Sequence, residues 1–277
     1  MSRFRKAICN DQFGDREIAD VFHYVGELGY DGVELNPYML SENIRDLSPA
    51  QRQDIRRMAK SAGVEIIGLH SILKTDTGFY YFNHPDASVR AETVEHLNDL
   101  IVLCGDLGGE IIVLGASKKR NIWPGVTFQQ AWDYAVEVFK GSLEAAGKYG
   151  VMLCLEPLTH LLTDFITQTS DAVRMVEEIS HPNFRMMLDV RSASHDAISI
   201  PDQIRQSARH LTHFHANDDN GKGPGAGNAD YAAIAAALRE INYDGYLSVE
   251  VFDFQPDPET IAKESLDTLK RYFGPRP

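Results

Sequence analysis

Short apolar runs rich in β-formers alternate along the chain with longer stretches in which apolar residues recur every three or four positions. The predicted strands cover residues 6–10, 32–36, 64–71, 110–116, 151–157, 185–190, 211–217 and 245–252. The predicted helices cover residues 16–28, 50–62, 86–107, 127–148, 170–180, 201–209, 230–240 and 258–272. Strict alternation favours a parallel sheet, and eight such units close into a barrel. We therefore predict an α/β protein, a single-domain (β/α)8 TIM barrel over residues 1–277.

Capping signals support these helix boundaries. Ser48-Pro49, Thr127, Ser170-Asp171 and Asp257-Pro258 stand where helices should begin, and Gly63, Gly108 and Gly150 stand where helices should end. A length of 277 residues suits one such barrel, which needs about 250. The alternative is an open doubly wound sheet, but no GxGxxG motif follows the first strand.

Composition and charge narrow the functional classes. With 43% hydrophobic and 24% charged residues, and no apolar run near the roughly 20 residues that span a bilayer, no membrane segment is expected. A net charge of −13 disfavours nucleic acid as a partner. No secretory leader is recognised, so a cytoplasmic location is expected. Three cysteines form no CxxC pair and are predicted to be reduced and buried: Cys9, Cys104 and Cys154.

Polar residues gather at the predicted carboxyl ends of the last four strands. Because side chains alternate along a strand, Glu156 shares the inward face with Cys154, and Asp189 shares it with Met187. The same parity turns inward His213 and His215 of the seventh strand, and Glu250 of the eighth. Three carboxylates and an imidazole are therefore predicted to converge at one rim of the barrel.

Such a cluster implies a cation, because buried carboxylates are costly unless they are paired or metal-bound. Taken singly, each carboxylate could be a cap or an ion-pair partner, and His215 could be an interior histidine with its hydrogen bonds satisfied. Their equivalent places on four consecutive strands favour a metal site formed by Glu156, Asp189, His215 and Glu250. Three oxygens and one imidazole without thiolate suit one divalent ion, with Mn²⁺ (manganese) first and Mg²⁺, Co²⁺ or Zn²⁺ as alternatives.

Further polar residues face the same interior. Asn10, Asn36 and His70 lie near the rim, where they either bind a polyhydroxylated ligand or satisfy loop backbone groups. Glu34 lies one layer deeper on the second strand, and we expect it to pair with Lys6 on the first strand.

Several segments resemble one family. Leu155-Glu156-Pro157, Met187-Leu188-Asp189-Val190, His213-Phe214-His215-Ala216-Asn217-Asp218 and the run from Tyr243 to Glu250 are similar to those of xylose isomerase-like barrels, the sugar phosphate isomerases/epimerases. Within this family the D-tagatose 3-epimerase group is the best-understood relative, and the motifs are specific for the family and the metal site but not for the substrate. The resemblance implies that Glu156, Asp189, His215 and Glu250 bind the metal, and that Glu156 and Glu250 are catalytic and exchange protons with a substrate carbon through a metal-stabilised enediolate.

Three positions depart from the pattern of the tagatose epimerase group. Ser192 stands where that group has a substrate-binding histidine, Leu162 where it has a second acidic residue, and Gly221 where it has an arginine. The resemblance therefore implies the metal site and the proton-transfer chemistry, but it does not imply free ketohexose as the substrate.

The expected function is a sugar isomerase or epimerase acting on a keto-sugar or derivative. Alternatives are a lyase of the inosose dehydratase type, and a sugar-binding or subunit barrel; an abasic-site endonuclease is disfavoured because it needs more histidines and a basic face. The expected partner is a small sugar, and homo-oligomer formation stays open. The candidate substrate contacts are His70, Lys118, Arg120, His160, Arg191, Asn217 and Lys222; the cations Lys118, Arg120 and Lys222 either bind a phosphate or carboxylate or simply solvate loops.

Overall fold

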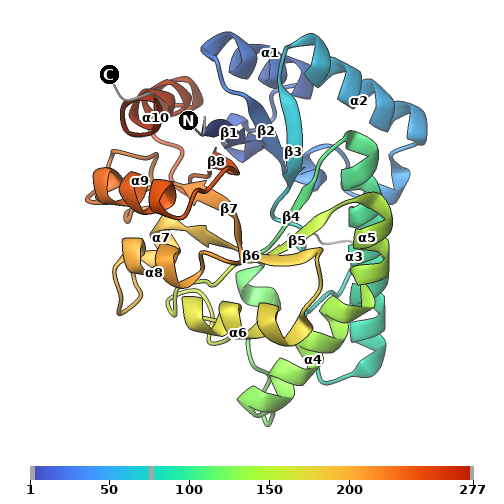
Figure 1. Ribbon diagram of the computed structural model, residues 1–277. Coiled ribbons are helices and arrows are strands. Elements are labelled where there is room, and N and C mark those ends of the chain that lie inside the picture. The colour runs from blue at the N-terminus through green and yellow to red at the C-terminus, as the bar shows by residue number, and fades with distance from the viewer. Residues whose placement is uncertain (1–3, 75–77, 275–277) are drawn as a thin grey trace.

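Eight parallel strands form a closed barrel in chain order, surrounded by a ring of helices (Figure 1). The computed structural model describes residues 4–74 and 78–274, so part of the predicted connection 72–85 lies outside the described residues. The barrel predicted from the alternation of strands and helices is thus confirmed. The strands are β1 (Arg5–Cys9), β2 (Gly32–Leu35), β3 (Glu65–Leu69), β4 (Ile111–Leu114), β5 (Met152–Leu155), β6 (Phe184–Asp189), β7 (Leu211–Ala216) and β8 (Tyr246–Val249).

The helices follow the prediction with two differences. They are α1 (Ile18–Leu28), α2 (Pro49–Ser61), α3 (Ala87–Leu107), α4 (Phe128–Gly141), α5 (Leu143–Tyr149), α6 (Thr169–Ile179), α7 (Val190–Ala193), α8 (Ile200–Gln206), α9 (Tyr231–Glu240) and α10 (Pro258–Phe273). The predicted helix 127–148 is two helices, α4 and α5, and the short α7 was not predicted. Gly141 lies so close to Val94 of α3 that a β-carbon there would be 2.9 Å from the Val94 side chain. Glycine and Ser142, both weak helix formers, end α4 at this contact.

The predicted helix starts are mostly made by side-chain caps. Ser48 and Thr127 each form a capping box with a glutamine three residues later, and the side chain of Asp257 accepts from the backbone N–H of Thr260. The fifth predicted start differs, because α6 begins at Thr169 and has no side-chain cap. Gly108 ends α3 in the left-handed conformation, with φ of 87°.

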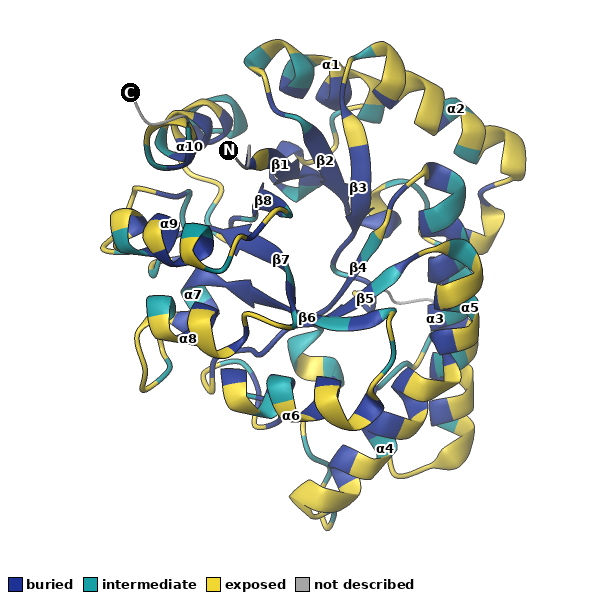
Figure 2. Cartoon of the chain, viewed as in Figure 1, coloured by how far each residue is buried: buried dark blue, intermediate teal, exposed yellow. Residues whose placement is uncertain are grey.

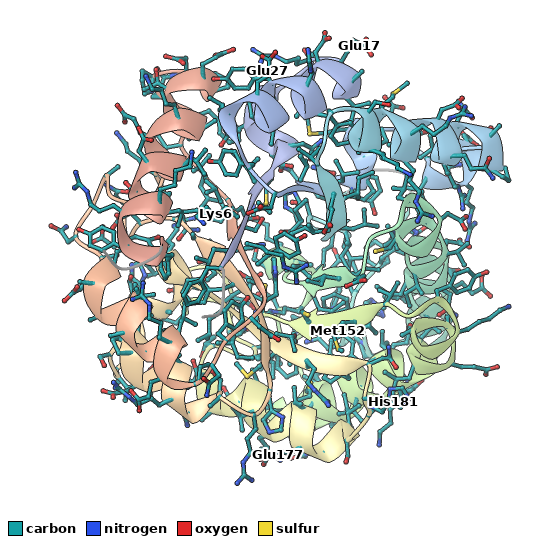
Figure 3. All side chains as sticks on the ribbon, turned by 45° about the horizontal axis from the view of Figure 1, so that its top comes forward. Lys6, Glu17, Glu27, Met152, Glu177 and His181 are labelled. Carbon is teal, nitrogen blue, oxygen red and sulfur yellow. The ribbon has the colours of Figure 1, made fainter. Side chains whose placement is uncertain are left out.

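The core has an outer apolar layer and a divided barrel interior. Buried residues make up most of the strands and the inner faces of the helices, while exposed residues lie mainly on the outer faces of the helices (Figure 2). Lys6 and Met152 lie within the ring of helices, whereas Glu17, Glu27 and Glu177 lie at the periphery (Figure 3). Toward the amino-terminal ends of the strands, the lower half of the barrel, the interior is apolar. It includes Ala7, Ile67 and Tyr246 in one cluster and Val113, Cys154 and Met187 in another. The buried acidic and histidine side chains lie toward the carboxyl ends of the strands, the upper half of the barrel.

Two register shifts align the strands that bear this polar half. Met186 pairs with Leu211 but Met187 pairs with His213, so β7 contributes one extra residue, and Asp189 comes to lie opposite His215. Without this shift Asp189 would lie opposite Phe214. A similar shift between β2 and β3 pairs Val33 with Ile66 and Glu34 with Gly68.

The three cysteines confirm the expectation of buried, unpaired thiols, since Cys9, Cys104 and Cys154 are all buried and none forms a disulfide. Among the helices of residues 4–74 and 78–274, none combines the length and the apolar character that crossing a membrane requires.

Candidate active site

Four predicted side chains meet at the carboxyl end of the barrel. Glu156 and Glu250 each follow the last residue of a strand, β5 and β8, while Asp189 ends β6 and His215 lies near the end of β7. One donor atom from each of the four lies within 4.8 Å of the others. The convergence expected from strand parity is therefore present in the structure.

Glu156 occupies a space left by a glycine. A β-carbon at Gly115, directly after β4, would clash with the carboxylate oxygen Oε2 of Glu156. The backbone carbonyl of Glu156 accepts a 2.8 Å hydrogen bond from the guanidinium of Arg120. Arg120 is only 1% exposed, and it also donates to the carbonyl of Ile166. The structure thus places Arg120 under the loops, where it fixes the backbone of Glu156; the sequence had suggested a substrate-binding cation above the site.

Asp189 accepts hydrogen bonds from the short helix that follows it and from the residue after β7. Its Oδ1 accepts a 2.7 Å hydrogen bond from the backbone N–H of Ser192, and its Oδ2 accepts a 2.5 Å bond from the side-chain amide of Asn217. Asn217 is fully buried, and its Oδ1 accepts from the backbone N–H of Arg191. The predicted substrate contact Asn217 therefore orients Asp189 in this structure.

His215 is held from below by Glu34. The Nε2 of His215 lies 3.2 Å from both carboxylate oxygens of Glu34, and the Nε2 of His213 lies 2.9 Å from Glu34 Oε2. The prediction that Glu34 pairs with Lys6 was wrong. Glu34 points from β2 across the barrel to β7, and the Lys6 ammonium donates to the carbonyl of Phe4. Two inward histidines spaced by two, above an inward glutamate, were the sequence signal for this group.

Glu250 bridges two imidazoles. Its Oε2 lies 3.0 Å from His215 Nδ1, and its Oε1 lies 3.3 Å from His70 Nδ1. The other nitrogen of His70, Nε2, lies 3.0 Å from the carboxylate of Asp11, a residue that the sequence analysis missed. His70 thus lies in the site as predicted. Asn10 instead accepts from the backbone N–H of Asn36, which satisfies a loop backbone group.

The electrostatics of the cluster are uneven. Burial and the nearby carboxylates of Asp189 and Glu250 raise the pKa of Glu156 to about 8. Burial and the charge of Glu250 also raise the pKa of Asp189. Burial opposes ionisation of Glu250. The charge and hydrogen bond of His215, and those of His70, nevertheless lower the pKa of Glu250 below its usual value. The Glu156 and Asp189 side of the cluster therefore lacks sufficient positive charge.

A divalent cation fits this arrangement. The raised pKa values of Glu156 and Asp189 mean that burial and the neighbouring carboxylates disfavour their ionisation, and a cation among the four donors would favour the ionised forms. Since Nε2 of His215 is occupied by Glu34, its Nδ1 is the nitrogen that faces the other donors. Cys9 also lies near His215 and Glu250, but burial raises the pKa of its thiol to about 12, which disfavours a thiolate ligand.

A cavity of about 490 Å³ opens above the cluster. Its lining includes the acidic residues Glu156 and Glu250 together with His70. The βα loops add apolar, basic and serine side chains, among them Leu73, Lys74, Ser117, Lys118, Lys119, Leu158, Leu162, Ser192 and Phe252. Two of the three positions that depart from the tagatose epimerase pattern, Leu162 and Ser192, therefore face this cavity.

The remaining predicted contacts divide between the cavity rim and other surfaces. Lys118 lines the cavity, and Arg191 stacks over the ring of the cavity residue Phe252 at 4.5 Å. His160 is exposed on its loop, whose Leu158 and Leu162 line the cavity. Lys222 lies 3.6 Å from the carboxylate of Asp253 and lines a separate hollow beside α10.

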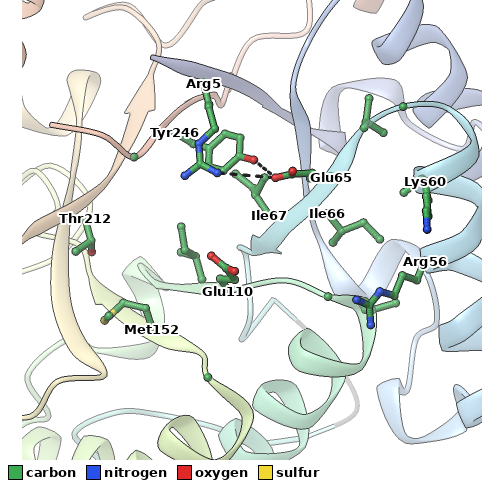
Figure 4. Close-up of a pocket in the computed structure, with 18 of the residues that line it drawn as sticks. Arg5, Arg56, Lys60, Glu65, Ile66, Ile67, Glu110, Met152, Thr212 and Tyr246 are labelled. Atoms are coloured by element: carbon green, nitrogen blue, oxygen red, sulfur yellow. Dashed lines mark hydrogen bonds and ion pairs between the residues drawn. The ribbon is translucent and has the colours of Figure 1, made fainter. Parts of the chain in front are cut away.

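A larger cavity of about 810 Å³ lies at the opposite, amino-terminal end of the strands (Figure 4). There Arg5 stacks on Tyr246, whose hydroxyl donates to Glu65, while Arg56 and Lys60 lie on the α2 side. Its floor is the apolar lower barrel, including Ile67 and Met152. The clusters of metal-type donors found in the described residues lie at the other end, which identifies the smaller cavity as the candidate active site.

The fold and this site define a (β/α)8 barrel with a candidate metal centre at the carboxyl ends of its strands. The chain belongs to the xylose isomerase-like TIM barrel family, whose model matches residues 22–272. It is 29% identical over 234 residues to a D-psicose 3-epimerase of Agrobacterium fabrum, covering 82% of this chain and 77% of that protein. It is 23% identical over 269 residues to the 3-dehydro-D-guloside 4-epimerase of Escherichia coli, covering 94% of this chain and 97% of that protein.

Solved structures show the same fold. A D-psicose 3-epimerase determined in the presence of D-fructose superposes with a TM-score of 0.85 at 23% identity, covering 98% of this chain and all of that one. A D-psicose 3-epimerase from Clostridium cellulolyticum determined with D-tagatose gives a TM-score of 0.86 at 21% identity, covering 99% of this chain and all of that one.

Proposed function

We propose that this chain is a divalent-metal-dependent isomerase or epimerase that moves a proton at the carbon beside the carbonyl group of a keto-sugar or a keto-sugar derivative. The proposal is supported above all by the convergence of Glu156, Asp189, His215 and Glu250 within 4.8 Å at the base of a cavity of sugar size. Relatives that match over 82% and 94% of the chain are sugar epimerases, and this chain is an enzyme acting on carbohydrate.

Glu156, Asp189, His215 and Glu250 are the residues that would hold the ion, for which manganese is our first choice. When bound, a divalent cation stabilises the negative charge that develops on the carbonyl and neighbouring hydroxyl oxygens of the substrate. The donor set of three carboxylates and one imidazole supports manganese, magnesium or cobalt over a thiolate-preferring metal.

Glu156 and Glu250 are the proposed proton carriers. They are the two outer members of the cluster, one following β5 and the other β8, with β6 and β7 between them. A substrate lying between these strands would present its two faces to different glutamates. One glutamate, ionised, removes the proton beside the carbonyl, and the other, protonated, gives its proton to the opposite face. The carbon is inverted and the two glutamates exchange protonation states. Return to the neighbouring carbon gives isomerisation instead.

The outer wall of the cavity supports a substrate with an anionic group. Lys74, Lys118 and Lys119 line the cavity, and within residues 4–74 and 78–274 no carboxylate lies within 4.0 Å of their ammonium groups. Lys119 contacts the ring of Tyr81 instead, at 4.9 Å. Lysines that have no carboxylate partner among the described residues, beside a sugar-sized cavity, favour a phosphate or carboxylate substituent. His70 and Arg191 are the proposed contacts for sugar hydroxyls.

Solvent exchange tests the proposal. Manganese-loaded protein is incubated in D₂O with keto-sugars, their phosphates and keto-glycosides, and the recovered sugars are analysed by NMR and mass spectrometry. We expect deuterium at the carbon beside the carbonyl of substrate or product, together with an inverted or isomerised sugar. E156Q and E250Q should reduce turnover by orders of magnitude while changing ligand binding much less.

Three results would contradict the proposal. An enone product that absorbs in the ultraviolet, formed without epimer, would assign the chain to the lyase class. Turnover without solvent deuterium in either sugar would exclude proton exchange with the glutamates. Equal, small effects of E156Q and E250Q on binding and turnover would favour a barrel that binds sugar without catalysis.

A further inference from the structure

A buried carboxylate lies beneath the proposed metal site, and the proposed reaction does not use it. Glu34 lies within β2, inside the barrel and with no exposed surface, and its side chain reaches across to two histidines of β7. Its carboxylate oxygens contact two imidazoles: Oε2 lies 2.9 Å from His213 Nε2, and Oε1 lies 3.2 Å from His215 Nε2. Both histidines are also fully buried.

Stability alone does not account for this group. Transfer of a carboxylate into a protein interior is expensive, and replacement of a buried ion pair by apolar residues of similar size is often neutral or stabilising. The layers below this group are in fact apolar, with Ile67 and Met187 among their members. His213 even keeps its Nδ1 without a hydrogen-bond partner among the described residues.

We infer that Glu34 is the positioning residue of the metal centre, which fixes the ring and the tautomer of His215 so that Nδ1 is presented to the cation. This inference rests on the proposed metal site. A neutral imidazole carries one N–H, and an Nε2–H donated to Glu34 leaves the lone pair on Nδ1. That nitrogen is the one that faces Glu250, at 3.0 Å.

The surrounding contacts make the arrangement rigid. A flipped His215 ring would turn a carbon toward Glu34 and lose both short contacts. His213 holds the carboxylate from its other side, because its Nε2 lies 2.9 Å from Glu34 Oε2. The register shift between β6 and β7 sets His213 opposite Met187 and His215 opposite Asp189, so the same shift that aligns two metal ligands also places both imidazoles above Glu34.

Metal affinity distinguishes positioning from simple filling of the barrel. Co²⁺ is titrated into the metal-free full-length protein, followed by calorimetry and by its visible absorption spectrum, for wild type, E34Q and T212V. E34Q keeps the side-chain shape but removes the charge that accepts from both histidines. T212V is the matched control, because Thr212 lies on the same strand one position from His213 and hydrogen-bonds Cys154 at 3.3 Å, away from the four donors.

We expect E34Q to weaken Co²⁺ binding by about 10- to 100-fold and to change the band positions or intensities of the Co²⁺ spectrum, with T212V close to wild type. A Kd within about twofold of wild type and an unaltered spectrum would overturn the inference, whatever the thermal stability of the variant. Should E34Q fail to fold, E34D keeps the charge but is too short to reach both imidazoles, and the same two measurements decide. If wild type itself binds no Co²⁺, the proposed metal site fails first.

Discussion

Removal of divalent cations should make the stability of this protein fall as the pH rises through neutrality, because Glu156 must then ionise among other carboxylates. Burial, with Asp189 and Glu250, raises the pKa of Glu156 from 4.5 to about 8. Each tenfold difference in proton affinity between the folded and unfolded states corresponds to about 1.4 kcal/mol. Ionised Glu156 therefore costs the metal-free fold about 5 kcal/mol above pH 8, at a side chain that is almost fully buried.

The direction in which stability changes with pH follows from proton binding. Between the unfolded pKa of 4.5 and the folded value of about 8, the folded state binds more protons than the unfolded state, so stability declines with rising pH. His70 and His215 have raised pKa values, against the effect of their burial, because of Asp11 and Glu250 respectively. Their stabilisation is likewise lost as the pH rises through their folded pKa values. A variant is therefore needed to isolate the contribution of Glu156.

The assay is urea unfolding of wild type and E156Q in excess EDTA, at pH values from about 5 to 8. The two proteins should have similar free energies of unfolding at the acidic end, and E156Q should be more stable by several kcal/mol at pH 8. Added Mn²⁺ should restore wild type much more than E156Q. The electrostatic account of the site would be refuted if the free energies of unfolding of the two proteins changed in parallel with pH. It would also be refuted if wild type became more stable relative to E156Q as the pH rises.

Three further changes test the surroundings of the cluster. G115A should lower kcat/KM by about 100-fold with little change in Tm, because its β-carbon displaces the Glu156 carboxylate; unchanged kinetics would contradict the close contact. N217A should weaken Mn²⁺ binding by about 10-fold or more through loss of its bond to Asp189, as measured by calorimetry. K118M should raise KM by about 10-fold for a phosphorylated or carboxylated keto-sugar but not for its neutral counterpart, and equal effects would count against an anionic substrate.

The fold and the four-residue cluster were predictable because both depend on local periodicity. Strand parity alone determines that Glu156 and Asp189 point inward, and equivalent strand positions determine that they meet. Parity could not identify the partner of Glu34, because a barrel brings several inward residues to the same depth. The register shifts between β2 and β3 and between β6 and β7 also affect which residues meet. The residues paired at the second shift include no glycine, and Gly68 at the first is a weak sign of a bulge.

The loop contacts were predicted less well because side-chain direction in a loop depends on tertiary packing. Lys118 and Arg120 are two positions apart, yet the first is exposed beside the cavity and the second is buried beneath it. Lys118 lies within the short helical turn Ser117–Lys119, and Arg120 follows its last residue; Ala116 precedes the turn in the left-handed conformation with φ of 50°. Charge alone could not distinguish the substrate side from the structural side of this loop.

Two of the three positions that were expected to depart from the tagatose epimerase pattern lie in the same cavity as the proposed metal ligands. Ser192 and Leu162 line the cavity, so their substitution changes what a sugar would touch directly. Gly221 differs in another way: its φ is 77°, and its carbonyl accepts from the backbone N–H of Phe252 at 2.8 Å. An arginine there would require a strained left-handed backbone, although its β-carbon would meet Arg191 and Phe252 at an ordinary contact distance of 3.5 Å. The ligands that would activate a keto-sugar are retained while three contacts that would select one have changed, which favours the same proton chemistry on a different sugar.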